Sequence, residues 1–355
     1  MKKKLLSVLL CATMVTGLFA GCASAPEKTT EKSTEKSTEA ASDTVAATDA
    51  ADTKASESDG ESKSASSNLK IGVTYCLLSA PAVKVFAQGI QEKAKELGIE
   101  LIELDGGWDP SKQTDQINSL VSQKVDGIVL NPVDGTSIIP AVKAAHEAGI
   151  PVVMGAMNID ESGSEYVTSF VGADDEDVGK SAGEMLKKTL GEKGGKVAIV
   201  EGTAGTSAQI LRTKGFEEAV AGSNIEIVTK LAGDYDKAKA MTVTEDILTK
   251  YPDIAGIWVH DDTMCVGVVQ AMKSMGLTGK DVAVVSYNGS KAGADMVKSG
   301  EIIATSVQPL VEEGRTSLDV LVKAINGEKV ESWYKDQIDL LDSTNVNDYD
   351  PSLLW

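Results

Sequence analysis

The chain has few histidines, cysteines and aromatic residues for its length of 355 residues. It contains two histidines and four cysteines, and aromatic residues make up 4% of the sequence. No nucleophile motif of the form G-x-S-x-G occurs, and the cysteines show no spacing typical of a metal site. The missing nucleophile, base and ligand patterns argue against an enzyme. For the same reason we expect no metal and no cofactor.

Two segments come closest to a metal site or a phosphate site. His260, Asp261 and Asp262 are contiguous at the end of an expected strand, where neighbouring side chains point to alternate sides, so few can converge on one metal ion. The glycine-containing residues 202–207 lie between an expected strand and helix and could suit a phosphate. Their spacing is not the dinucleotide fingerprint, however, so a nucleotide role stays a minor alternative.

Basic residues are also in the minority. The chain has 34 Lys and Arg against 53 Asp and Glu, which gives a formal net charge of −19. No basic patch or stripe stands out, so we expect no nucleic-acid partner. The length suggests two domains of about 150 residues each, and 42% hydrophobic residues suffice for large cores.

Long apolar runs are missing as well, apart from residues 5–20, which three lysines precede and Gly21 and Cys22 follow. The run is short for a membrane-spanning helix, which needs about 20 residues. The segment resembles a bacterial lipoprotein signal. That resemblance implies a signal peptide over residues 1–21 and a lipid on Cys22, which anchors the chain on the extracytoplasmic face of a Gram-positive cell membrane. An ordinary secretory signal or an N-terminal membrane helix is the alternative.

Residues 22–68 have the composition of a linker. They are nearly all Ser, Thr, Ala, Glu, Asp and Lys, include a literal repeat over residues 30–38, and contain no aromatic residue. Such a segment cannot bury enough apolar surface to offset the entropy of ordering it. We therefore predict a disordered, acidic Ser/Thr-rich linker with a reach of roughly 35–40 Å.

From residue 69 onward, short β-branched segments alternate with amphipathic ones. Apolar side chains in residues 83–97 follow the 3.6-residue spacing of a helix, which Gly98 is placed to end, and the helical pattern recurs over residues 117–123. Strands are expected at residues 70–75, 99–104, 127–130, 150–154, 196–200, 225–230, 255–259 and 282–286. This alternation predicts right-handed βαβ units and an α/β fold. Residues 125–154 parallel residues 254–286, which indicates two similar lobes with a ligand cleft between them.

Polar side chains follow several of these strands. Asn131, Asp261 and Asn288 each come at a strand end, Arg212 lies in the helix after residues 205–207, Tyr235 follows a loop, and Gln308 precedes the last helix. Such groups supply donors, acceptors and a flat face for a hydroxyl-rich ligand. A capping or turn role is the alternative for each.

The ordered body, from residue 69 to about 347, resembles the ribose- and galactose-type sugar-binding proteins of ABC importers. The stretches that carry this resemblance are Val-Asp-Gly-Ile-Val-Leu-Asn-Pro-Val-Asp at 125–134, 148–153, 171–175, 204–208 with Arg212, 215–216, 261–267, 286–289 and 304–308. It implies the type I periplasmic binding protein fold: two Rossmann-like lobes with parallel sheets, joined by a three-segment hinge near residues 171–173, 306–309 and 334–337. The implied lobes are residues 69–172 plus about 309–335, and residues 173–308 plus about 336–347.

The resemblance also implies residue roles. Asn131, Arg212 and Gln308 match ligand-binding positions, Tyr235 stands for a stacking Phe, Asp261 for a binding Asn, and Asn288 for a binding Asp. The first lobe departs from the family, because residues 76–83 lack two stacking aromatics and Ala156-Met157 replaces an Asp-Arg pair. These changes suggest a larger or more apolar ligand than ribose. Trp108 is the candidate replacement for the lost rings; a packing role is equally open.

The function that follows is an extracytoplasmic solute-binding lipoprotein of an ABC importer. We expect a monomer that closes two lobes on a sugar or related small polar ligand and delivers it to a permease. A sensor that reports to a membrane kinase or chemoreceptor is the alternative, whereas a repressor of the lac type would need a basic helix-turn-helix at its start. Cys76 and Cys265 lie in apolar sequence and fit small buried residues better than a disulfide.

Overall fold

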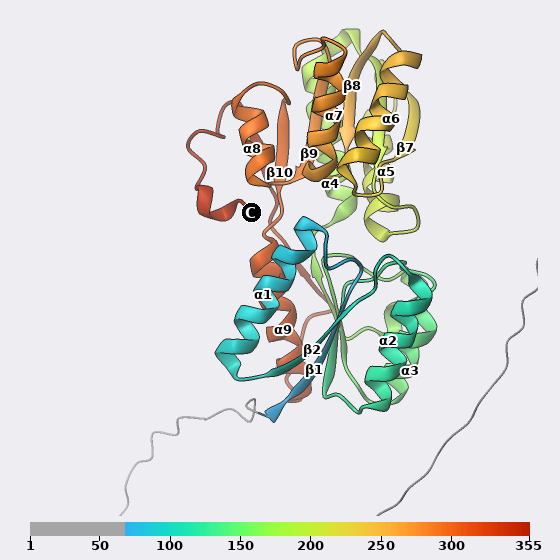
Figure 1. Cartoon of the computed structure of the whole chain (residues 1–355), viewed down its shortest axis with the longest axis vertical. Coiled ribbons are helices and arrows are strands. Elements are labelled where there is room, and N and C mark those ends of the chain that lie inside the picture. The colour runs from blue at the N-terminus through green and yellow to red at the C-terminus, as the bar shows by residue number, and fades with distance from the viewer. Residues whose placement is uncertain (1–67) are drawn as a thin grey trace, which may run out of the picture. The chain divides into compact units, whose positions relative to one another are not determined.

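The computed structural model describes residues 68–355 (Figure 1). The expected signal peptide, the expected lipidation site Cys22 and the predicted linker up to residue 67 lie outside the described residues. Within residues 68–355, no helix is long and apolar enough to cross a membrane.

The first sheet has six strands in the order β11-β5-β4-β3-β1-β2, all pairs parallel. Its strands are β1 (Lys70–Tyr75), β2 (Glu100–Asp105), β3 (Gly127–Leu130), β4 (Val152–Gly155), β5 (Ser169–Gly172) and β11 (Trp333–Lys335). Helices α1 (Pro81–Leu97) and α9 (Leu310–Ile325) cover one face, and α2 (Pro110–Ser122) and α3 (Ile139–Glu147) cover the other (Figure 1).

The second sheet has the order β12-β10-β9-β8-β6-β7, with only the β10–β12 pair antiparallel. Its strands are β6 (Gly195–Glu201), β7 (Ile225–Ala232), β8 (Ile254–Val259), β9 (Ala283–Asn288), β10 (Ala304–Val307) and β12 (Asp339–Asp342). Helices α4 (Asp175–Leu190) and α5 (Ser207–Val220) pack on one face. On the other face lie α6 (Lys237–Lys250), α7 (Asp262–Ser274) and α8 (Lys291–Lys298). We call the body around the first sheet the N-lobe and the body around the second the C-lobe.

Local sequence explains most element boundaries. Every residue of β3 is buried, as expected of a strand covered by helices on both faces. Helix α1 ends where Gly98 adopts the left-handed conformation, with φ of 69°. Helix α2 starts seven residues before the apolar spacing begins at Ile117, because the Asp109 side chain accepts from the first-turn amides and Pro110 occupies the first helical position.

The chain passes between the two lobes three times: after β5, after β10 and after β11. The first and third passages are hydrogen-bonded to each other, since Gly172 O accepts from Asp336 N at 3.2 Å and from Trp333 Nε1 at 3.0 Å. Two mostly parallel sheets, joined by three segments, confirm the expected α/β fold class. The third passage is thus tied to the first, and adjacent short segments of this kind are typical of a hinge between domains.

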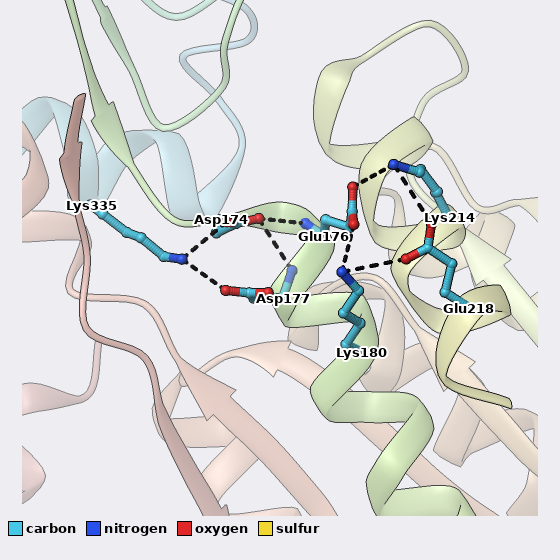
Figure 2. Close-up of polar contacts among 7 residues, drawn as sticks. All are labelled: Asp174, Glu176, Asp177, Lys180, Lys214, Glu218 and Lys335. Atoms are coloured by element: carbon cyan, nitrogen blue, oxygen red, sulfur yellow. Dashed lines mark hydrogen bonds and ion pairs between the residues drawn. The ribbon is translucent and has the colours of Figure 1, made fainter. Parts of the chain in front are cut away.

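A charged cluster reinforces this hinge (Figure 2). Lys335, the last residue of β11 before the third passage, donates to Asp174 Oδ2 at 3.0 Å and to Asp177 Oδ2 at 2.8 Å. Asp174 also caps helix α4 by accepting from the amides of Glu176 and Asp177. The cation at residue 335 is therefore attached directly to the helix that begins the C-lobe.

Farther along α4, Glu176 holds Lys180 on its own helix and Lys214 on α5, and both lysines reach Glu218 (Figure 2). These pairs link two neighbouring helices on the C-lobe surface. Because such pairs are largely exposed, they position the helices more than they stabilise the fold.

Candidate functional site

A cavity of about 70 Å³ lies between the lobes, at the carboxyl ends of the strands. A single water molecule needs about 10–15 Å³ on this scale, so the cavity suits a small molecule. All seven residues singled out in the sequence line it: Trp108, Asn131, Arg212, Tyr235, Asp261, Asn288 and Gln308. Parallel strands end at the same edge of a sheet, which is why these distant residues meet.

Arg212 is the most tightly held of them. It lies on α5, is 4% exposed, and its Nε donates to Asp175 Oδ1 at 2.7 Å. Its Nη1 donates to His260 O at 2.8 Å, and the guanidinium stacks over the Tyr287 ring at 4.2 Å. A guanidinium has five N–H donors, so three remain for a ligand. Burial raises the pKa of Asp175, although the charge of Arg212 opposes that shift.

His260 lies in the interior of the C-lobe. Its side chain is fully buried beside Arg212, and burial lowers its pKa well below the usual value, so the ring is neutral. Gly202 N donates to its Nδ1 at 3.3 Å. Among residues 68–355, no cluster of three or more histidine, cysteine or acidic side chains is placed to hold a metal ion.

Asp261 combines the capping role with a place in the cavity. It is the N-cap of α7, with its Oδ1 accepting from Met264 N at 2.7 Å, and it is 4% exposed. Burial raises its pKa to about 7, opposed by the Met264 hydrogen bond. Asp262 points into the C-lobe instead, where it accepts from Ser290 N and Thr305 Oγ1. Only the first of these two acids is therefore available to a ligand.

Asn288, Gln308 and Glu313 form a chain of side-chain hydrogen bonds behind the cavity. Asn288 Nδ2 donates to Gln308 Oε1 at 2.8 Å, and Gln308 Nε2 donates to Glu313 Oε2 at 2.9 Å. The chain fixes the orientation of both amides and leaves the buried Asn288 Oδ1 without a partner. An unpaired buried acceptor is costly, so this oxygen is suited to accept a hydrogen bond from a ligand hydroxyl.

On the N-lobe side, Asn131 already uses part of its hydrogen-bonding capacity within the protein. Its Oδ1 accepts from Cys76 N at 3.3 Å and its Nδ2 donates to Gly155 O at 3.1 Å, so it braces three strand ends. One N–H and one lone pair of its amide remain. It can thus contact a ligand, but with less capacity than Arg212.

Trp108 and Tyr235 meet across the cleft. The ring of Trp108, from the N-lobe, stacks on that of Tyr235, from the C-lobe, with centroids 6.0 Å apart and planes 13° apart. The back of the Tyr235 ring lies against Gly202, where a Cβ atom would overlap it. Trp108 therefore lines the cavity and also forms an aromatic contact between the lobes.

The backbone around the cavity is unusual. Among residues 68–355, four of the six non-glycine residues with positive φ line it: Trp108 (57°), Ala156 (62°), Tyr235 (55°) and Asn288 (104°). The left-handed region costs energy for residues with a side chain, and such residues concentrate at ligand sites. This conformational feature marks the same site independently of the polar side chains.

Sequence reasoning missed part of the lining. Phe86, assigned only to the core face of a helix, also lines the cavity, and so does Thr263. The apolar character of Phe86 gave no signal of a ligand site. Cys76 lines the cavity too, and within the described residues Cys76 and Cys265 are both free and buried, as expected.

Comparisons with known proteins agree with this geometry. A family model described as a periplasmic binding protein domain matches residues 71–329. The ribose import binding protein of Bacillus subtilis is 34% identical over 272 residues, covering 76% of this chain and 86% of that protein. Among solved structures, a galactofuranose binding protein has a TM-score of 0.75 and 28% identity, covering 79% of this chain and 96% of that one. An ABC transporter solute binding protein from Bacillus halodurans with bound myo-inositol has a TM-score of 0.75 and 29% identity, covering 80% and 98%.

Proposed function

The chain belongs to the periplasmic binding protein family, as a type I sugar-binding protein of ABC importers rather than an enzyme, and from that membership we propose its role. It binds one sugar or sugar-related molecule in the cavity between its lobes and delivers it to an importer permease. The relatives named above are described as binding ribose, galactofuranose and myo-inositol, which supports a ligand with several adjacent hydroxyls.

One observation carries this proposal: Arg212 with its free donors and Asn288 with its unpaired oxygen line one cavity. A hydroxyl group both donates and accepts, so adjacent hydroxyls satisfy both residues together. Asp261 supplies a further acceptor. An analogue that lacks one hydroxyl leaves a buried group unpaired, at a cost of about 1–3 kcal/mol.

Closure of the lobes is the step that encloses the ligand. The N-lobe amide of Asn158 donates to Ser207 Oγ of the C-lobe at 3.0 Å, and Trp108 of the N-lobe stacks on Tyr235 of the C-lobe. These contacts exist only while the lobes are together, and a ligand that touches both lobes favours that state by its differential affinity. The closed body then presents both lobes to the permease as a monomer.

We further propose that the body is tethered by a lipid on Cys22 through the linker of residues 22–68. The support is the lysine-rich start, the apolar run and the small residue before Cys22. Incorporation of radiolabelled palmitate into the full chain, but not into a Cys22→Ala variant, is the expected result. Equal labelling of both would contradict the proposal.

The binding role is tested by a thermal-shift screen of the purified full chain against sugars, polyols and nucleosides. Ligand at about 100 times its Kd stabilises the folded state by roughly 2.7 kcal/mol. In an Asn288→Gly variant, which tolerates the positive φ, the shift is expected to fall strongly. The matched Asn326→Gly change, at an exposed helix end, is expected to leave it intact. No stabilisation by any compound would refute sugar binding.

A ligand-sensing role remains the alternative, because the site of a sensor would be built in the same way. Uptake of the identified ligand separates the two. Deletion of the gene for this chain is expected to abolish uptake of the labelled ligand at low concentration, whereas a sensor would change only the response to it.

A further inference from the structure

The two walls of the cavity differ in chemistry. Of the seven lining residues in the C-lobe, six are polar: Arg212, Tyr235, Asp261, Thr263, Asn288 and Gln308. The N-lobe side includes Val83, Phe86, Ala156 and Met157, and its one amide side chain, Asn131, is engaged at both ends. Hydroxyl groups thus find partners chiefly on one side of the bound molecule.

The loop after β4 shows most clearly that the second wall is apolar. Its four consecutive amides are all used within the protein. Ala156 N donates to Val171 O, Met157 N to Gly155 O, Asn158 N to Ser207 Oγ, and Ile159 N to Asn158 Oδ1. This loop therefore offers a ligand no backbone N–H donor. Ala156 and Met157 of this loop line the cavity, and their side chains are a methyl group and a thioether.

Met157 is held firmly in this wall. It is 8% exposed and packs in one apolar cluster with Cys76 and Val133 of the N-lobe and Ala208 of the C-lobe. The cluster joins the lobes at the apolar end of the cavity. A hydroxyl placed there would be removed from water without a partner, whereas a methyl group would gain contacts.

We propose that the ligand is a deoxy sugar or deoxy polyol, with adjacent hydroxyls against Arg212 and Asn288 and its methyl or methylene group against Ala156 and Met157. The inference rests on the proposed sugar-binding function and names the substrate class of that site. An apolar pocket rejects an added hydroxyl only moderately, so the preference for the deoxy compound is expected to be roughly 10- to 100-fold.

The test is calorimetric titration of the full chain with matched pairs that differ by one oxygen: D-galactose and D-fucose, L-mannose and L-rhamnose, D-ribose and 5-deoxy-D-ribose. In the stereochemical series that binds, the deoxy member should bind at least tenfold more tightly. A Met157→Gln variant, which adds an amide to the apolar wall, should reduce that preference at least tenfold. The same change at the exposed Met275 should leave it unaltered.

The outcomes separate the two proposals. A parent sugar that binds as tightly as its deoxy partner, or an undiminished preference in Met157→Gln, overturns the deoxy assignment and leaves sugar binding standing. If neither member of any pair binds, and the wider screen is negative, the sugar-binding function itself is refuted and the deoxy assignment falls with it.

Discussion

Replacing Arg212 with Ala tests the centre of the site, and it should affect stability as well as binding. The substitution leaves the carboxylate of Asp175, which is 5% exposed, without its partner at 2.7 Å. Removing one member of a buried ion pair typically costs about 3–5 kcal/mol. The total free energy of unfolding of such a protein is about 5–15 kcal/mol, so we expect a folded but clearly destabilised variant.

A paired variant separates the two effects. Arg212→Met with Asp175→Leu removes both charges and keeps the volume filled, which is often neutral or stabilising. We expect urea unfolding, followed by circular dichroism, to show most of the lost stability regained, while the ligand-induced shift stays absent. Lys214→Ala serves as the control, because Lys214 lies on the same helix but its ion pairs are exposed, and no measurable loss is expected. A loss below about 1 kcal/mol in Arg212→Ala, the ceiling for an exposed pair, would refute the reasoning.

Two further predictions concern the hinge and the aromatic contact. Burial raises the pKa of Asp336 to about 7, and burial with the nearby Asp336 raises the pKa of Glu313 well above normal. Between about pH 4 and pH 7, the folded state therefore holds protons that the unfolded state has released. As the pH rises through this range, the free energy of unfolding should fall by up to about 1.4 kcal/mol per pH unit for each such proton. Asp336→Asn should flatten that slope in urea titrations, unlike the exposed Asp348→Asn; an identical slope in both would contradict the role of Asp336. Gly202→Ala should displace the Tyr235 ring and weaken ligand binding, as measured by calorimetry. In a Tyr235→Ala background the same change should cost much less, and simple additivity of the two losses would show that the predicted overlap does not occur.

The sequence predicted the strands well where helices cover both faces of the sheet. Strands β1 and β3 match the expected residues 70–75 and 127–130, because β-branched runs covered by helices on both faces leave a continuous apolar signal. The apolar spacing placed the start of α2 too late. The helix starts at the Asp109-Pro110 cap instead. That cap acts through backbone amides, so a search for regularly spaced apolar residues does not find it.

The position of the site could be predicted from the sequence, but the hydrogen bonds among its side chains could not. Strand-end polar residues such as Asp261 and Asn288 had to converge, since parallel strands share one carboxyl edge. That Asn131 is engaged at both ends, or that Glu313 orients Gln308, depends on side-chain geometry that no spacing encodes. Phe86 was missed as a lining residue because an apolar side chain in a cleft looks, in sequence, like any core residue.

The left-handed residues of the cavity also bear on how quickly the protein can respond to its ligand. Trp108, Ala156, Tyr235 and Asn288 hold conformations that a flexible loop would rarely visit. Their ordering cost is met once, when the protein folds, and not again at each binding event. The cavity walls are thus preorganised, and capture requires only rotation at the hinge. We expect the association rate to follow the opening and closing of the lobes rather than any rearrangement of the loops that carry these residues.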